Sequence, residues 1–288
     1  MHQDPEFRQS RALRDLEWAI ESPSLITDSA DDIQPPRLPD FDQIDIRELE
    51  SFLVPYSRFR IGEYFEGLIL YWLERIRGVK IIAQHQQVFE NGQTVGEIDF
   101  LFEDESGVLT HWETAVKFYL YWPAANRTGS HFVGPNVKDT FEKKIHRLFE
   151  HQLPLSQQHY PEVIHRRALV KGCIFYHPDD ERPRELPARL APEHAQAFWL
   201  RFAELFRFLA QAQNPLFLIR EKPDWLSPAL CSPADPDLLS YDKLQHHLET
   251  HFQKSPRPIL ISVLTEQDSL CQEIERAFIV PDHWPHIH

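Results

Sequence analysis

The sequence is poor in cysteine and has no long apolar run. Its three cysteines, Cys173, Cys231 and Cys271, lie far apart without C-x-x-C spacing, so neither a disulfide framework nor a zinc knuckle is expected. No apolar run reaches the roughly 18 residues that span a bilayer. The first residues also lack the apolar segment of a secretory signal. We therefore expect a cytoplasmic protein that makes no membrane contact.

Positive charge and glycine are also scarce. The 30 Lys and Arg residues stand against 44 Asp and Glu residues, which gives a formal net charge of −14 over 288 residues. This balance opposes tight non-specific binding to a polyanion such as DNA, but it allows an enzyme whose basic residues gather in one groove. Nine glycines against 23 prolines indicate stiff connections. Most of the 16 histidines stand in polar runs, and we expect them at the surface.

The pattern along the chain predicts one large core with additions at both ends. Residues 1–45 are expected to form an N-terminal helix and an acidic, proline-rich strap, residues 46–178 an α/β core, and residues 179–288 a C-terminal α+β extension packed on that core. Within the core, a helix precedes a meander of three strands, and a second helix leads to a further strand. This order predicts a mixed α/β sheet flanked by helices.

Apolar periodicity locates the individual elements. A helix is expected where apolar residues recur three and four positions apart, and a strand where β-branched and aromatic residues alternate with polar ones. The expected helices span 7–20, 46–54, 61–78, 137–151, 191–213 and 241–252; the expected strands span 79–89, 94–102, 108–120, 167–176, 216–220 and 259–264. Residues 277–285 are predicted as a last edge strand, because Pro281 and Pro285 block further pairing.

A hairpin over residues 96–120 carries the residues best suited to chemistry. If its turn centres on Ser106, Asp99 comes opposite Glu113. The face that they share also carries Glu97, His111 and Lys117. The other face is apolar, so the hairpin is expected inside the fold with its polar face partly covered by helices. A plain half-exposed sheet, whose charges pair across strands, is the alternative.

Two carboxylates at a cross-strand distance suit a hard divalent cation. Mg²⁺ prefers one or two protein carboxylates together with water and phosphate oxygens, and a bound metal lowers the pKa of its water. A nearby lysine can orient that water or offset charge in the transition state. Asp99 and Glu113 are therefore the candidate ligands of Mg²⁺, or of Mn²⁺ in its place, and Lys117 is the candidate lysine.

The motifs GEIDFLF and HWETAVKFYL resemble the central hairpin of the PD-(D/E)xK nuclease superfamily. The resemblance implies a restriction endonuclease-like fold, in which Asp99 and Glu113 bind the metal, Lys117 is the catalytic lysine and Glu66 is the glutamate of the preceding helix. The spacing departs from the usual Glu-x-Lys, because three residues lie between Glu113 and Lys117, which gives Glu-x-x-x-Lys. Lys117 is therefore expected about 6 to 7 Å further along its strand than the superfamily pattern requires.

Most of the chain past residue 50 also resembles an uncharacterised bacterial family catalogued as domain of unknown function 1853. The similarity covers YFEGLILYWL, VGPN, HQLPLS, ALVKGCIFY and FIVPDHWP, together with the two hairpin motifs. It implies membership of a family without an established reaction. The expected nuclease chemistry therefore comes from the hairpin and from the superfamily that the hairpin resembles.

Positive charge collects in residues 111–172, which hold nine Lys or Arg and five Asp or Glu. Lys143 and Lys144 on the expected helix, and Lys171 in an apolar strand, are candidate phosphate contacts. Solvated helix faces explain such charges equally well.

The leading hypothesis is a Mg²⁺-dependent, nuclease-like enzyme that hydrolyses phosphodiesters with a metal-activated water and has nucleic acid as its candidate partner. The first alternative is a catalytically inactive module that binds nucleic acid or a protein through the same cleft. The second is a structural protein whose polar sheet face has no chemical role.

Overall fold

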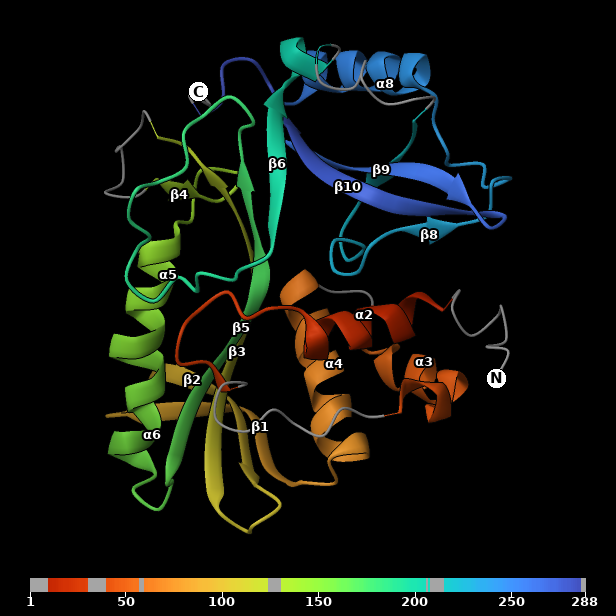
Figure 1. Ribbon diagram of the computed structural model, residues 1–288. Helices are drawn as coiled ribbons and strands as arrows, with labels where there is room; N and C mark the ends of the chain where they lie inside the picture. The colour runs from red at the N-terminus through yellow and green to blue at the C-terminus, as the bar shows by residue number, and fades with distance from the viewer. Residues whose placement is uncertain are drawn as a thin grey trace. The chain divides into compact units, whose positions relative to one another are not determined.

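Figure 1 shows a computed structural model, which describes residues 10–30, 40–56, 60–123, 131–205, 207 and 215–285. The chain divides into two compact units. Unit 1 comprises Met1–Lys117, Glu142–Gly172 and Leu186–Ala195, and unit 2 comprises Phe118–Phe141, Cys173–Glu185 and Gln196–His288. Each unit collects segments that lie far apart in the sequence. The division into three consecutive segments stays a prediction.

The strands form a mixed ten-stranded sheet, whose hydrogen-bonded order is β1-β2-β3-β5-β6-β10-β9-β7, with β4 paired to β3 and β8 to β10. Their bounds are β1 (Lys80–Glu90), β2 (Gln93–Glu103), β3 (Leu109–Tyr121), β4 (Phe132–Val133), β5 (His165–Tyr176), β6 (Gln196–Arg201), β7 (Leu216–Arg220), β8 (Leu230–Cys231), β9 (Ile259–Gln267) and β10 (Leu270–Val280). β6 runs parallel to β5 and β10, whereas the β1–β2 and β2–β3 pairs are antiparallel. This mixed sheet with flanking helices confirms the predicted α/β class.

In the described part of unit 1, five α-helices surround the strands. They are α2 (Arg11–Glu21), α3 (Ile46–Leu53), α4 (Ile61–Tyr71), α5 (Phe141–Arg147) and α6 (Leu153–His159). Helix α5 begins one residue before the middle segment of the unit. A π-helical turn, Leu148–Gln152, joins α5 to α6. A second π-helical turn, Trp72–Ile76, extends α4. Figure 1 shows α2, α3 and α4 as a red-to-orange group, and these three helices pack against one another.

The apolar face of the β2–β3 hairpin is buried as expected. Ile98, Phe100 and Phe102 have no more than 1% of their surface exposed. Trp112 on β3 lies against Trp72 at the end of α4, with the ring centroids 5.9 Å apart. Burial of large aromatic side chains contributes strongly to stability, so this contact anchors α4 to the hairpin.

In unit 2, α8 (Tyr241–Lys254) covers a second apolar core. Leu244 and Leu248 of this helix are fully buried, and they belong to one cluster with residues of β6, β7, β9 and β10. Among the helices that the structure describes, none is long and apolar enough to cross a membrane.

Two predicted elements are wrong. The helix predicted over 191–213 is replaced by β6 and a 3₁₀ turn, Phe202–Glu204, and part of the predicted range lies outside the described residues. Trp199 and Leu200 point to opposite faces of the sheet and are both fully buried. A strand buried on both faces has no alternation, so its pattern cannot be told from that of a buried helix.

The second wrong prediction is the last edge strand. β10 ends at Val280 and pairs with β6 on one side and β9 on the other, so it lies inside the sheet. Pro281 follows the last paired residue and interrupts no ladder bond. The other predicted strands agree with the structure within a few residues. The helix predicted over 137–151 begins at Phe141 and continues to His159.

Gly172 in β5 allows a close backbone approach in unit 1. Its φ is +152°, and a Cβ placed there would stand 1.8 Å from the Lys117 carbonyl oxygen. L side chains rarely adopt this backbone conformation, and backbone atoms cannot move aside as a flexible side chain can. The residue therefore lets β5 lie directly against the end of the β3 segment that carries Glu113.

We predict that Gly172→Ala lowers the free energy of unfolding by about 3 kcal/mol or more, because the methyl group overlaps with backbone. Gly62→Ala on α4 is the matched control, since nothing lies within 4 Å of a Cβ at that position. Its effect should stay within about 1 kcal/mol. Urea unfolding monitored by tryptophan fluorescence measures both, and equal stability of the two variants would contradict the packing described here.

Candidate functional site

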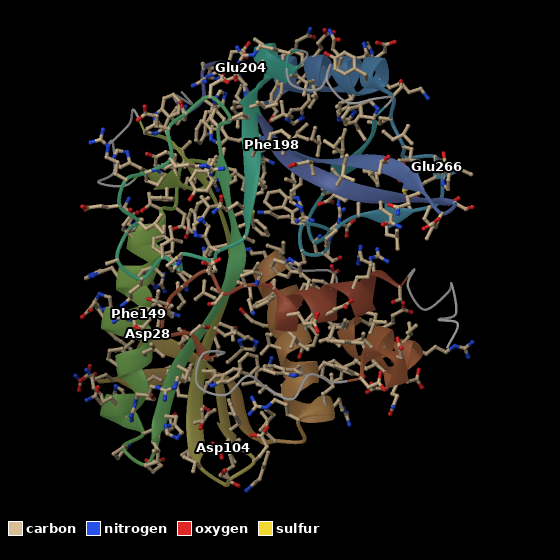
Figure 2. All side chains as sticks on the ribbon, viewed as in Figure 1. Asp28, Asp104, Phe149, Phe198, Glu204 and Glu266 are labelled. Atoms are coloured by element: carbon tan, nitrogen blue, oxygen red, sulfur yellow. The ribbon has the colours of Figure 1, made fainter. Side chains whose placement is uncertain are left out.

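The β2–β3 hairpin has the register expected from a turn centred on Ser106. Figure 2 labels Asp104 at the tip of this hairpin. The Asp104 carboxylate accepts hydrogen bonds from Ser106 N at 2.8 Å and Val108 N at 2.9 Å, which closes the turn in one geometry. The ladder runs from Glu103↔Leu109 to Phe100↔Trp112. The next position in this register brings Asp99 opposite Glu113.

At that position, side-chain bonds replace backbone bonds between the two strands. The backbone N–H of Asp99 donates to Glu113 Oε1 at 3.4 Å, and the backbone N–H of Thr114 donates to Asp99 Oδ2 at 2.8 Å. Each carboxylate therefore caps an amide on the opposite strand. The structure brings Asp99 and Glu113 together, and each one helps to position the other.

His85 extends this row onto β1. The β1–β2 ladder pairs Gln84 with Phe100 and Gln86 with Ile98, so His85 lies opposite Asp99. Its φ is +51°, a left-handed conformation that few residues other than glycine adopt and in which asparagine, aspartate and histidine are enriched. A cross-strand row of three side chains, from His85 through Asp99 to Glu113, thus runs over β1, β2 and β3.

Glu97 and Glu66 border the β1 end of this row. His85 Nδ1 lies 3.4 Å from Glu97 Oε1, and His85 Nε2 lies 3.6 Å from Glu66 Oε2 on α4. The ligand atoms of His85, Glu97 and Asp99 all lie within 4.8 Å of one another. Among the described residues, this is the group whose nitrogen and oxygen donors converge closely enough to hold a metal ion.

Glu113 is fully buried, and protein groups surround both of its oxygens. Oε1 faces His111 Nε2 at 2.9 Å, and Oε2 accepts from Gln152 Nε2 at 2.5 Å. Gln152 Oε1 in turn accepts from Lys144 Nζ at 3.2 Å. A chain of hydrogen bonds therefore links this carboxylate to a lysine of α5.

The other side of His111 is fixed by Ser156 and Arg166. Ser156 Oγ lies 2.7 Å from His111 Nδ1 and accepts from Arg166 Nε at 3.0 Å. The Ser156 hydroxyl has a second acceptor in the Leu153 carbonyl oxygen at 3.3 Å, so Arg166 alone does not decide where its proton goes. When the ionised Glu113 carboxylate accepts from Nε2–H, the neutral ring leaves Nδ1 as an acceptor for Ser156. Burial lowers the pKa of His111 to about 4, in keeping with a neutral ring.

Burial and mutual repulsion raise the pKa values of the clustered carboxyls. The pKa of Asp99 rises to about 7, mainly because of burial and then because of the charge of Glu113. Burial raises the pKa of Glu113 to about 7, and the charge of Lys144 opposes that rise. The pKa of Glu66 rises to about 8 through burial and the charges of Asp99, Glu63, Glu97 and Glu113. The site thus holds more negative charge than its surroundings neutralise.

Lys144 and Lys117 contribute positive charge to this region. Burial and the neighbouring charge of Lys117 lower the pKa of Lys144, whereas Glu113 and Asp99 raise it. The charge of Lys144 also lowers the pKa of both carboxyls. Lys144 is therefore the lysine whose charge acts on both Asp99 and Glu113, and Lys117 is close enough to Lys144 to repel it.

The two remaining candidates lie in different surroundings. Lys143 is exposed on α5. Lys171 is buried, and its Nζ donates to the carbonyl oxygens of Ile20 at 3.2 Å and Ser22 at 2.6 Å, at the C-terminal end of α2. A cation at a helix C-terminus complements the helix dipole, so these bonds give Lys171 a structural partner. Its phosphate contact stays a prediction.

The strap that follows α2 is held by Arg189. Figure 2 labels Asp28 and Phe149, and the Arg189 side chain joins these two residues. Its Nη1 lies 3.4 Å from Asp28 Oδ2, and its guanidinium carbon lies 3.8 Å from the centre of the Phe149 ring. Ser24 also forms an isolated bridge with Lys171. These contacts fix residues 22–30 of the predicted strap, while residues 31–39 lie outside the described part.

Sequence reasoning missed His85, Gln152, Ser156 and Arg166. The sequence does carry a signal for Gln152 and Ser156. These two residues stand four positions apart and therefore share one face of the helix that covers the hairpin. His85 lies in the strand predicted over 79–89, where no sequence signal gave it a role at the site, and none placed Arg166 beside Ser156.

We predict that Glu66→Gln stabilises the metal-free protein increasingly as the pH rises from about 5 to 8. Below the ordinary pKa of 4.5, Glu66 is protonated in both the folded and the unfolded state, so burial of the neutral carboxyl does not make stability depend on pH in that range. As the pH rises toward the folded pKa of about 8, the folded state alone retains the proton, and wild type loses stability. Urea unfolding in the presence of EDTA gives the difference between variant and wild type at each pH. A difference that does not change with pH would contradict the raised pKa.

Comparisons with known proteins place the chain in a family. Residues 14–280 match the family model described as a domain of unknown function, DUF1853. No curated protein matches the chain. No solved structure matches it either. Because the family model spans most of the sequence, the protein belongs to the DUF1853 family.

Proposed function

We propose that the protein hydrolyses phosphodiester bonds of nucleic acid in the cytoplasm, with a divalent metal ion held at Asp99. The observation that carries this proposal is the convergence of carboxylates from β2, β3 and α4 on one partly buried site. Burial raises the pKa values of Asp99, Glu113 and Glu66 to about 7 or 8, and repulsion among these carboxylates adds to the rise for Asp99 and Glu66. A cation relieves such repulsion.

The arrangement also supports the proposed relation to the PD-(D/E)xK superfamily and its restriction endonuclease-like fold. Asp99 on β2 faces Glu113 on β3, and Glu66 stands on the helix that precedes both strands. The donors are oxygen atoms of carboxylates, which suit Mg²⁺ or Mn²⁺. The bound ion would supply an acidified water and would neutralise charge on the phosphate.

The protein residues have separate tasks in this scheme. Asp99 binds the ion directly. Glu113, held by His111 and Gln152, keeps Asp99 and its amide in place. Lys144 stabilises negative charge that develops on the phosphate, and Lys117 adds to the positive field. Lys143, exposed on the same helix as Lys144, contacts the phosphates of the nucleic acid.

A catalytically inactive module that binds nucleic acid or a protein is the second candidate. Protein donors hydrogen-bond to both oxygens of Glu113, and these bonds favour a structural role for that carboxylate. The spacing between Glu113 and Lys117, which departs from the superfamily pattern, favours the same alternative.

We predict that Asp99→Asn lowers hydrolysis by at least about a hundredfold. Loss of the ion costs several kcal/mol of transition-state stabilisation, and about 1.4 kcal/mol corresponds to a factor of ten. The assay uses single- and double-stranded DNA and RNA with Mg²⁺ or Mn²⁺. Asp268→Asn, the same change at an exposed position, is the control. Activity that survives in Asp99→Asn would contradict the proposal, and an inactive wild type on every substrate would favour the binding module.

We predict that Lys144→Met reduces kcat by about tenfold or more, while Lys117→Met has a smaller effect, because the charge of Lys144 acts on Asp99 and Glu113. Lys143→Met should raise KM and leave kcat nearly unchanged, as expected for a phosphate contact outside the reacting atoms. Steady-state kinetics on one oligonucleotide separates these effects. A larger loss of kcat in Lys117→Met than in Lys144→Met would contradict this assignment.

A further inference from the structure

We infer that the metal ion of the proposed reaction is a transition metal bound by an imidazole, with His85, Glu97 and Asp99 as its protein ligands. The inference rests on the proposed function for the role of the ion, but the binding itself can be tested without hydrolysis. It moves the ion from the Asp99–Glu113 pair to the β1 side of Asp99, and it adds a nitrogen donor from a strand that the superfamily motif does not include.

The first argument is the placement of the donors. One ligand atom each from His85, Glu97 and Asp99 lies within 4.8 Å of the others. Two donors that share an ion, each about 2.1 Å away, stand at most about 4.2 Å apart. A movement of about half an ångström, well within side-chain freedom at exposed positions, therefore closes the group around one ion. His85 and Glu97 are exposed, so they can make this movement and admit the ion from solvent.

The second argument is the orientation of the imidazole. His85 Nδ1 faces Glu97 at 3.4 Å, while Nε2 faces Glu66 at 3.6 Å. Histidines that bind metals commonly direct their second nitrogen at a carboxylate, which fixes the ring and raises its basicity. When Nδ1 binds the ion, Nε2 is the second nitrogen, and Glu66 is the carboxylate that it faces. Glu66 is therefore a positioning residue for His85.

The third argument is that Glu113 is already committed to protein donors. Its two oxygens accept from His111, Gln152 and the amide of Asp99, and the side chain is fully buried. Oε1 already accepts two hydrogen bonds, and an ion at Oε2 would need room beside Gln152 Nε2, which lies 2.5 Å from that oxygen. His85 and Glu97 are exposed, and the contact of His85 Nε2 with Gln84 Nε2 at 3.3 Å leaves Nδ1 on the side of Glu97, so Asp99 shares the ion with them.

The ligand set determines the class of metal. Carboxylates alone suit Mg²⁺, whereas imidazole suits zinc, copper, iron and nickel, and affinity rises from Mn²⁺ through Co²⁺ toward the later metals. One nitrogen and two carboxylates therefore favour Co²⁺ or Zn²⁺ over Mg²⁺, with Mn²⁺ between them.

The test is isothermal titration calorimetry of the full chain with Co²⁺, Zn²⁺, Mn²⁺ and Mg²⁺. Absorbance of bound Co²⁺ in the visible range reports its donor atoms. The first variant is His85→Asn, because asparagine tolerates the left-handed φ of +51° and lacks the imidazole. Glu97→Gln removes the second ligand with little change in shape. His247→Asn on α8 is the control, since that histidine is exposed and belongs to unit 2. Circular dichroism verifies that each variant is folded.

We expect one site that binds Co²⁺ and Zn²⁺ at least about tenfold more tightly than Mg²⁺. His85→Asn and Glu97→Gln should each weaken Co²⁺ binding by about tenfold or more, and His85→Asn should also change the Co²⁺ spectrum. His247→Asn should leave this site unchanged. Equal affinity of wild type for Mg²⁺ and Co²⁺, or unchanged Co²⁺ binding in His85→Asn, would overturn the inference.

Hydrolysis measured on the same proteins separates this inference from the proposed function. Co²⁺ bound through His85 without hydrolysis of any nucleic acid would support the metal site and contradict the proposed reaction. Full Mg²⁺-dependent hydrolysis by His85→Asn would support the reaction and overturn the assignment of the ligands.

Discussion

The exchange of backbone bonds for carboxylate bonds at Asp99 and Glu113 is the constraint on which the site depends. An amide in a sheet needs an acceptor, and here each strand provides a side-chain oxygen in place of a carbonyl. This exchange holds two acidic groups between adjacent strands, where the helix that contains Gln152 and Ser156 covers Glu113. Burial raises both pKa values because it penalises the charged form of each carboxylate, and a bound cation would stabilise that charged form.

The same constraint divides the carboxylates into two groups. Glu113 is held by His111 and Gln152 inside the fold, and its role is to position the strand that carries it. Glu97 is exposed and faces an imidazole, and Asp99 lies between the two groups. Asp99 is thus positioned by Glu113 on its buried side, and it faces the metal-binding groups of His85 and Glu97 on its exposed side. Lys144 balances part of the charge through Gln152.

The hairpin was predictable because local chemistry sets its register. Asp104 closes a tight turn with its own side chain, so the positions of Asp99 and Glu113 followed from counting residues. The place of His85 did not follow in this way. A two-residue turn at Asn91–Gly92 pairs Glu90 with Gln93, and continued without interruption it would bring His85 opposite Ile98. A register shift between Val88 and Phe89 moves His85 opposite Asp99 instead. Such a bulge has no clear sequence signal.

Long-range contacts account for the other failures of sequence reasoning. The partner of Lys171 is the end of α2, about 150 positions earlier in the chain, and no local pattern connects the two. Trp199 and Leu200 of β6 point to opposite faces of the sheet and are both fully buried, which removes the alternation that identifies a strand. The mixed α/β class followed from the order of elements. The set of residues that converge at the site required the tertiary structure.

The central claim is that a divalent ion binds at Asp99, and a crystal structure of the protein soaked in Mn²⁺ tests it most directly. Anomalous scattering identifies the metal independently of the atomic model. The account predicts one strong anomalous peak about 2.1 Å from a carboxylate oxygen of Asp99 and bordered by His85 and Glu97. A fully occupied peak elsewhere, with none at Asp99, would contradict it.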